Sequence, residues 1–304
     1  MNMAPLLEKM VIFVVLMVLG YFCSRSGMLS RSFSRDASKL VINVFMTGTV
    51  INSVLGLENT MSGGEFFNIM LVLSISVVIC YLMGALLGRL VPMSRERRPV
   101  YELLVSVTNN MFIALPVLSE LYGPKAIFLC SLSCLPFNVA LFTYGTSRLK
   151  QDGSAMRIRD VFSVPLVSTL VAVAIFVLRP PIPKIVSDLI TTMASATMPL
   201  SMFVVGAALG SVSLLESFTD KKLYLMAFVR LLICPVLVWV VTGWLTTDPM
   251  LLGAGVIIAA APTGIIVTSL SLQYERDAVF ASKGVLLTTA LSMVTIPLLV
   301  YILL

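Results

Sequence analysis

Ten long apolar stretches, separated by mostly short polar connections, follow one another along the chain. They cover residues 4–26, 36–56, 65–89, 98–122, 125–148, 160–178, 183–210, 222–245, 250–273 and 276–302. Most are close to the roughly 20 residues that a helix needs to cross the hydrocarbon core of a bilayer. The pattern predicts an all-α polytopic membrane protein with ten transmembrane helices, numbered here as spans one to ten.

The composition supports this prediction. Of 304 residues, 58% are hydrophobic and 12% are charged, whereas soluble domains carry about 25% charged residues. The first stretch differs from a cleavable signal peptide because it is longer than an apolar signal core and has no A-x-A site after it. Glu8 and Lys9 also interrupt its start. We therefore expect the first stretch to be retained as a span.

Lysine and arginine residues gather in the connections after the odd-numbered spans, which accounts for the net charge of +6. The other connections hold only Lys125, Arg179 and Lys184. The positive-inside rule places the basic connections in the cytoplasm and both termini outside. We expect a multi-pass protein of the plasma membrane, or bacterial inner membrane. No interleaving of aromatic and basic residues indicates a nucleic-acid partner.

Metal and cofactor chemistry finds little support in the sequence. The chain has no histidine, and its five cysteines lie in apolar stretches without a Cys-x-x-Cys pair. Small buried side chains are the expected role for these cysteines, and we predict no metal site and no cofactor. A proton carried through the protein would have to use a carboxylate, a lysine or water.

Two pairs of short segments indicate an internal repeat. Y-G-P-K-A-I-F (122–128) resembles Y-E-R-D-A-V-F (274–280), and S-K-L-V (38–41) resembles S-D-L-I (187–190). The offsets, 152 and 149 residues, are close to half the chain. Five spans per half would give the halves opposite orientations in the membrane. We predict a first five-helix repeat at 1–148, a cytoplasmic linker at 149–159 and an inverted repeat at 160–304. The alternative is that the short matches arise by chance in an apolar sequence.

Spans four and nine each contain a proline near the middle. Pro116 ends the stretch V-T-N-N-M-F-I-A-L-P, and Pro262 follows I-I-A-A-A. Proline removes a helix hydrogen bond and clashes with the preceding turn, so we expect each proline to open the second half of its helix. Matching interruptions in two halves indicate a transporter's binding site. A kink used only for packing is the alternative.

The asparagine doublet distinguishes span four from other spans that contain proline. An amide without a partner in hydrocarbon costs several kcal/mol, and Asn109 and Asn110 point to different faces of a helix. We expect them to line a ligand site or cavity, although a structural hydrogen bond between helices would also explain them.

The residues around this doublet resemble the auxin efflux carrier family. That family has a pattern close to N-x-G-F-x-G-x-P, of which this chain keeps Asn109, Phe112 and Pro116. Met111 and Ala114 replace the two glycines. Asn138, in F-N-V-A-L-F-T-Y-G, matches an asparagine-containing fifth span.

The resemblance extends to the second half of the chain. The segments M-P-L-S-M-F-V-V-G-A-A-L (198–209), R-L-L-I-C-P (230–235), A-A-P-T-G (260–264) and A-S-K-G-V-L-L-T-T-A-L-S-M-V-T-I-P (281–297) fit the family. Span two departs from it, because Thr47 and Gly48 stand where the family usually has a proline.

This resemblance implies a fold and a function. It implies ten helices in two inverted repeats, with spans four and nine unwound and crossing near the membrane centre, as in bile-acid symporters and sodium/proton antiporters. A transport domain would move against a scaffold by alternating access. Family substrates are small organic anions, such as auxins in plants and malonate or other carboxylates in bacteria. Family members form dimers, which makes a homodimer an expected assembly.

An anionic substrate also agrees with the physics of broken helices. A half-helix opened by proline would present free N–H groups and the positive end of its dipole. Thr263 would cap such a half-helix or bind a carboxylate oxygen, and the asparagines would donate amide hydrogens. The predicted substrate-binding residues are Asn109, Asn110, Pro116, Asn138, Pro262, Thr263 and Gly264.

Three ionisable residues are candidates for ion coupling or charge pairing. Arg230 and Lys283 lie about two turns inside their spans, where an unpaired charge is expensive. Either would pair with a substrate carboxylate or take part in proton coupling; packing charges that reach the interface are the alternative. Glu102 shares a helix face with Asn109, but snorkelling to the cytoplasmic end also explains it. The sequence leaves open whether the coupling ion is a proton or sodium.

Other classes of protein share parts of this pattern. A membrane-embedded ligand sensor would use the carrier fold without transport, and an anion channel would share the topology. An intramembrane enzyme would need a catalytic constellation that this histidine-free chain does not offer, so we predict no enzymatic activity.

Overall fold

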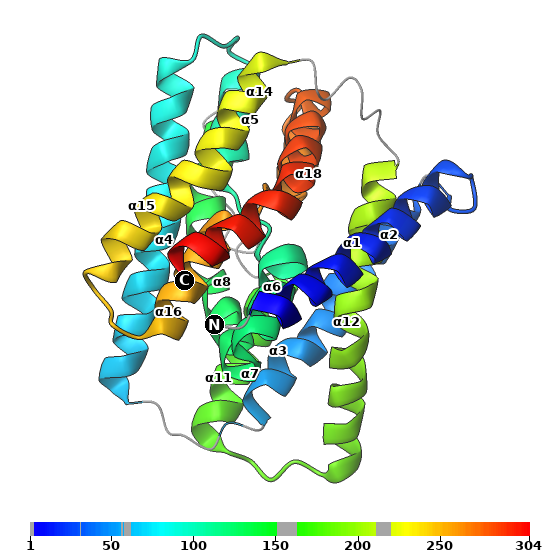
Figure 1. Cartoon of the computed structure of the whole chain (residues 1–304), viewed down its shortest axis with the longest axis vertical. Helices are drawn as coiled ribbons and strands as arrows, with labels where there is room; N and C mark the ends of the chain where they lie inside the picture. The colour runs from blue at the N-terminus through cyan, green and yellow to red at the C-terminus, as the bar shows by residue number, and fades with distance from the viewer. Residues whose placement is uncertain (1–2, 31, 56, 58–61, 151–162, 211–219) are drawn as a thin grey trace. The chain divides into compact units, whose positions relative to one another are not determined.

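The computed structural model describes residues 3–30, 32–55, 57, 62–150, 163–210 and 220–304. These residues are helical almost throughout (Figure 1), and within them the only β pairing is an isolated bridge between Thr108 and Thr263. The predicted all-α architecture is confirmed for this part of the chain. The linker predicted at 149–159 lies outside the described residues from 151 onward.

Helices coincide with the apolar stretches to within a few residues. In the first half they are α1 (Met3–Arg25), α2 (Phe33–Leu40), η1 (Val41–Phe45), α3 (Met46–Leu55), α4 (Gly63–Leu90), α5 (Arg97–Ser106), η2 (Asn110–Ala114), α6 (Leu115–Tyr122), α7 (Pro124–Leu132), α8 (Cys134–Ala140), η3 (Leu141–Gly145) and α9 (Thr146–Leu149). In the second half they are α11 (Val164–Leu178), α12 (Lys184–Gly210), α14 (Lys221–Phe228), η4 (Val229–Ile233), α15 (Cys234–Gly243), α16 (Pro249–Ala260), α17 (Ile266–Gln273) and α18 (Ala278–Leu303). The η elements are π-helical turns inside longer helical runs.

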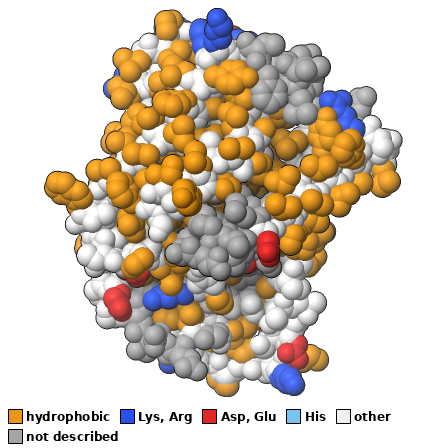
Figure 2. All heavy atoms as spheres, viewed as in Figure 1, with side chains coloured by type: hydrophobic (Ala, Val, Ile, Leu, Met, Phe, Trp, Pro, Cys, Tyr) orange, Lys and Arg blue, Asp and Glu red, His pale blue; other side chains and the backbone are white. Residues whose placement is uncertain are grey.

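Six helical runs of the described chain are long and apolar enough to cross a membrane. They are Phe33–Leu55, Gly63–Leu90, Pro124–Leu149, Lys184–Gly210, Lys221–Gly243 and Ala278–Leu303. Shorter apolar helices include Asn110–Tyr122 and Pro249–Ala260, which belong to the interrupted spans four and nine. Hydrophobic side chains cover much of the face drawn in Figure 2, as expected for a surface in contact with lipid. The ten-helix inverted repeat stays a prediction.

The helices form two compact units, and each unit contains segments from both predicted repeats. The first unit comprises Met1–Phe66, Met111–Cys134 and Phe162–Val212. In it α1 packs closely along α12, because a Cβ atom on Gly20 or Gly206 would collide with backbone atoms of the other helix. This close approach of small residues is typical of membrane helices.

Polar side chains tie α3 to its neighbours inside the first unit. The Thr49 hydroxyl donates to Thr197 Oγ1 of α12 at 2.7 Å. The hydroxyls of Thr47 and of Ser168, in α11, are 2.9 Å apart. Thr47 stands where the auxin efflux carrier family usually has a proline, and here it links two helices through hydroxyl groups. Such bonds contribute about 0.6 kcal/mol on average in a membrane.

The second unit comprises Phe67–Asn110, Leu135–Val161 and Ser213–Leu304. Its core includes Tyr101, Leu103 and Leu104 of α5, all fully buried. α18 packs against α5, α14, α16 and α17. Arg276, in the turn before α18, donates to the Leu149 carbonyl at 2.8 Å and to the Lys150 carbonyl at 3.5 Å, which caps the C-terminal end of α9. The second unit contains both interruptions described next.

Candidate binding site at two broken helices

The interruption of span four lies at its polar residues. α5 ends at Ser106, Val107 is extended (φ −92°, ψ 116°), and the helix resumes at Asn110. From Asn110 the helical run continues to Tyr122 through Pro116, so the expectation that Pro116 opens the second half is wrong. Pro116 is the second residue of α6, which follows the π-helical turn η2, and a missing N–H is tolerated in the first turn of a helix. It also belongs to the first compact unit, not the second.

The interruption of span nine lies at its proline, as expected. α16 ends at Ala260, Ala261 is extended (φ −61°, ψ 144°), and α17 begins at Ile266. Proline disfavours the helical conformation in the residue before it, so Pro262 accounts for the extended Ala261.

The two interruptions pair with each other through backbone hydrogen bonds. The Asn109 N–H donates to the Pro262 carbonyl at 2.8 Å, and the Gly264 N–H donates to the Val107 carbonyl at 3.0 Å. These bonds flank the antiparallel bridge of Thr108 and Thr263. Non-helical backbone at membrane depth is tolerated only where protein or a water-filled cavity satisfies it. The interruptions of spans four and nine therefore pair with each other at one point, which we call the crossing, and each strand satisfies the other.

Thr263 anchors this crossing to two further helices. Its hydroxyl donates to the Leu104 carbonyl of α5 at 2.5 Å, and its N–H donates to Thr288 Oγ1 of α18 at 3.2 Å. The side chain is fully buried. Because a hydroxyl has one proton to donate, Thr263 would have to release Leu104 before it could donate to a carboxylate.

Arg230 lies against the same crossing. It projects from the π-helical turn η4, is fully buried, and donates through Nη2 to the Ala261 carbonyl at 2.7 Å. Its Nη1 is 3.5 Å from Cys80 Sγ of α4. The Ala261 carbonyl marks the C-terminal end of α16, which carries partial negative charge, so a cation is stabilised there.

The charge of Arg230 is only partly compensated by the described residues. None of their carboxylates lies within 4.0 Å of its guanidinium, and Nε has no acceptor among them. A buried charge is costly unless it is paired. The Nε group of Arg230 is therefore a buried donor that no described residue satisfies.

A small cavity adjoins the crossing. It has a volume of about 10 Å³ and is lined by Ser76, Val77, Cys80, Ser106, Thr108, Phe137, Ile258 and Ala259. This is about the room that one water molecule needs. Cys80 connects the cavity to Arg230, and Thr108 connects it to the bridge.

The predicted asparagines are all buried in the second unit. Asn109 is 6% exposed, Asn110 4% and Asn138 5%. Asn109 contributes its backbone to the crossing, and Asn110 begins the second half of span four. The structure thus brings together Asn109, Pro262, Thr263, Gly264 and Arg230, with Asn110 next in sequence. Asn138 lies on α8 in the same unit, and Pro116 lies in the other.

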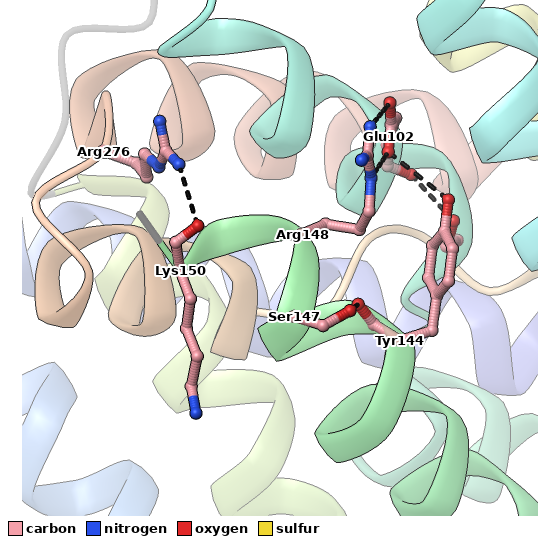
Figure 3. A network of polar contacts seen from close by, with 7 residues as sticks. Glu102, Tyr144, Ser147, Arg148, Lys150 and Arg276 are labelled. Atoms are coloured by element: carbon pink, nitrogen blue, oxygen red, sulfur yellow. Dashed lines mark hydrogen bonds and ion pairs between the residues drawn. The ribbon is translucent and has the colours of Figure 1, made fainter. Parts of the chain in front are cut away.

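Glu102 does not snorkel to the membrane surface. Its side chain is 1% exposed and accepts two hydrogen bonds from Arg148, from Nε at 2.7 Å and from Nη2 at 2.8 Å. Tyr144 also donates to Glu102, at 3.5 Å (Figure 3). The Glu102 side chain also lies against Gly88 of α4, where a Cβ atom would collide with it. The snorkelling interpretation is therefore wrong: Glu102 is enclosed because Arg148 supplies its counter-charge.

Lys283 lies on α18, where it is half-buried. Its charge acts on Asp277, which caps α18 by accepting from the Phe280 N–H at 2.8 Å and pairs with Arg97 at 2.7 Å. This places the Lys283 charge near the beginning of α18.

Several residues of the crossing carried no clear sequence signal. Thr288 of α18 supports Thr263, and Cys80 of α4 lies beside Arg230; both are ordinary membrane residues in the sequence. Thr108 had a usable signal, because three consecutive polar residues (108–110) favour a helix terminus over a helix interior. Arg148 is 46 residues from Glu102, so only the fold reveals their pairing.

A crossing of two interrupted helices in an apolar helical protein is typical of secondary transporters. Comparison with known families agrees: the chain belongs to the family described as membrane transport protein, whose model matches residues 5–159 and 153–300. The resemblance to the auxin efflux carrier family is thereby confirmed.

Two relatives span essentially the whole chain. One is an uncharacterized transporter of Methanothermobacter thermautotrophicus, 25% identical over 303 residues, with 96% of each chain covered. Another is an uncharacterized transporter of Methanocaldococcus jannaschii, 22% identical over 307 residues, with 98% of this chain and 99% of the relative covered. Both are named as transporters over a comparable length.

Proposed function

We propose that the protein is a secondary active transporter of a small organic anion. The substrate class is a carboxylate, such as malonate or another mono- or dicarboxylate, or an auxin-like acid. Arg230 is the observation that carries this proposal: a fully buried cation, held at the crossing by the Ala261 carbonyl, with no carboxylate of the described chain within 4.0 Å. An anionic substrate would complete its pairing.

Further donors near the crossing support an anion. The amides of Asn109, Asn110 and Asn138 are buried in the same unit. The second halves of the broken helices begin at Asn110 and Ile266, and their positive ends favour negative charge. Pro262 and Gly264 shape the extended strand from which Thr263 projects.

Alternating access is the transport mode that we propose, with a proton or sodium as the coupling ion. Glu102 is the proposed proton acceptor if the ion is a proton, because it is an enclosed carboxylate whose pairing with Arg148 depends on its charge. The remaining parts of the proposal are two inverted repeats, location in a plasma membrane with both termini outside, and assembly as a homodimer.

Uptake into proteoliposomes tests this function. Vesicles containing the protein should accumulate a radiolabelled dicarboxylate such as malonate when a proton or sodium gradient is imposed, and Arg230→Gln should abolish uptake. Arg35→Gln, which removes the same charge from an exposed position on α2, should leave uptake unchanged. Ligand binding without accumulation would indicate a ligand sensor instead of a carrier. A flux far above the turnover of carriers would indicate a channel.

Thermal stability resolves the substrate class. The purified protein is screened against small mono- and dicarboxylates at two pH values. We expect at least one of these compounds to raise its melting temperature. The Arg230→Gln variant should stay monodisperse and lose this shift. Equal shifts in melting temperature for the Arg230→Gln variant and the unmodified protein would show that Arg230 is not part of the binding site.

A further inference from the structure

A second basic site lies away from the crossing, at the other end of α5. It is a cavity of about 210 Å³ lined by Ala85, Arg89, Arg98, Glu102, Tyr144 and Arg148, which we name the arginine cavity. These residues come from α4, α5, η3 and α9, all within the second unit. α5 thus connects the arginine cavity at its first turn with the crossing at its last.

The arginine cavity has excess positive charge. Its lining holds three arginines and one carboxylate, a net charge of +2. The carboxylate, Glu102, is 1% exposed and already accepts both hydrogen bonds that Arg148 offers. Figure 3 shows Tyr144 and Arg148 both directed at Glu102. Glu102 therefore forms the inner wall of the cavity. Its negative charge is paired with Arg148 and does not neutralise Arg89 or Arg98.

Arg89 and Arg98 are the available cations of this cavity. Both are exposed, and neither forms an ion pair with a described residue. They project from the last turn of α4 and the first turn of α5, so they approach the cavity from two sides. Two guanidinium groups around a shared space are suited to an oxyanion that accepts several hydrogen bonds.

Phosphate is the oxyanion that fits this arrangement best. The planar guanidinium fork matches phosphate geometry with two parallel hydrogen bonds. Basic pockets between membrane helices on the cytoplasmic side are typical binding sites for acidic lipid headgroups. Leu82, Leu86 and Leu90 are exposed on one face of α4 next to Arg89 and offer an apolar path for an acyl chain. The cavity itself has room for a headgroup and not for a whole lipid.

We propose that the arginine cavity binds a phosphate group, held by Arg89 and Arg98. The phosphate belongs either to the headgroup of an anionic phospholipid or to a soluble phosphate compound. This site is separate from the proposed carboxylate site at Arg230, and its occupancy does not depend on transport.

Native mass spectrometry of the full chain, stripped of lipid in detergent, tests the proposal. We expect phosphatidylglycerol to bind in preference to phosphatidylcholine, and Arg89→Gln or Arg98→Gln to weaken that binding about tenfold, the effect of losing one charge-assisted hydrogen bond. Arg95→Gln is the matched control, since Arg95 is exposed in the connection just before α5 but does not line the cavity. The control should bind phosphatidylglycerol like the unmodified protein.

Competition separates the two sources of phosphate. Displacement of phosphatidylglycerol by millimolar glycerol phosphate, lost in Arg89→Gln, would support a soluble ligand; resistance to it, with the same dependence on arginine, would support the lipid. Equal binding of both phospholipids, together with no competition by glycerol phosphate, would overturn the proposal. Unchanged binding by the Arg89→Gln and Arg98→Gln variants, with monodispersity confirmed by gel filtration, would also overturn it.

Discussion

Thr108 and Thr263 form the antiparallel bridge at which the interrupted spans four and nine cross. The bridge is flanked by two backbone hydrogen bonds, from Asn109 to Pro262 and from Gly264 to Val107. It satisfies backbone groups that neither helix could satisfy alone. The strength of this pairing should therefore respond to small changes in the strands that form it.

Gly264 lets the two strands approach closely. A Cβ atom at this position would lie 3.1 Å from the Thr108 carbonyl oxygen and 3.4 Å from Val107 Cγ1. We expect Gly264→Val to lower the free energy of unfolding by about 1–3 kcal/mol, the usual effect of overpacking. Thermal unfolding in detergent measures this. Gly243→Val is the control, since a Cβ atom there meets nothing within 4 Å; an equal loss in both variants would contradict a tight crossing.

The hydroxyl of Thr263 should stabilise the crossing independently of any ligand. Thr263→Val removes its hydrogen bond to the Leu104 carbonyl and leaves that carbonyl buried. We expect a loss of about 1–2 kcal/mol in thermal or denaturant unfolding. Thr263→Ser keeps the donor and should recover part of the loss. If valine were tolerated as well as serine, the bond to Leu104 would contribute nothing.

The Glu102–Arg148 pair should be asymmetric, because Glu102 is 1% exposed and the Arg148 side chain is 41% exposed. Arg148→Ala leaves a carboxylate buried without its counter-charge, a change that costs about 3–5 kcal/mol in buried pairs. Glu102→Gln leaves an arginine that water can reach, so we expect a smaller loss. Unfolding of both single variants and the double variant measures the difference. A larger loss from Glu102→Gln would contradict the enclosure of Glu102.

The sequence predicted the helices better than it predicted the site. Apolar length determines where a membrane helix lies, so each predicted stretch coincides with helical segments within a few residues. Pro262 was placed correctly because proline constrains the residue before it. The interruption of span four was wrongly assigned to Pro116. At the repeat offset of 152 residues, Pro262 corresponds to Asn110 and not to Pro116. Glu102 was misjudged because its partner, Arg148, approaches it only through tertiary packing.

Asp277 should make stability depend on pH in the acid range. Burial alone would raise the pKa of its carboxyl, but hydrogen bonds from the Phe280 N–H and Arg97, with the charge of Lys283, lower it overall. Because its pKa is lower in the folded state, the ionised Asp277 carboxylate stabilises the fold at pH values above its unfolded pKa of about 3.9. This stabilisation is lost as the pH falls through the folded pKa. The stability difference between the unmodified protein and Asp277→Asn should therefore be constant above about pH 5 and shrink below pH 4. A difference that grew on acidification would contradict this assignment.

Glu275 occupies a backbone position that favours glycine. It has φ 52°, and the N–H of the next residue, Arg276, donates to the Ser271 carbonyl at 2.7 Å, which is the long bond of a Schellman motif closing α17. At the repeat offset of 152 residues Glu275 corresponds to Gly123, which has φ 71° and ψ −158° after α6. That conformation is essentially restricted to glycine.

Exchanging residues at these two corresponding turns should have opposite effects. Glu275→Gly removes the steric penalty of a left-handed residue and should raise the free energy of unfolding by up to about 1 kcal/mol, because part of the gain is offset by the freedom of glycine in the unfolded chain. Gly123→Ala introduces such a penalty and should lower it by about 1–3 kcal/mol. Melting temperatures of the two variants, measured beside the control Gly243→Ala, check both signs. Stabilisation by Gly123→Ala, or destabilisation by Glu275→Gly, would contradict the positive φ angles that the structure gives to these two positions.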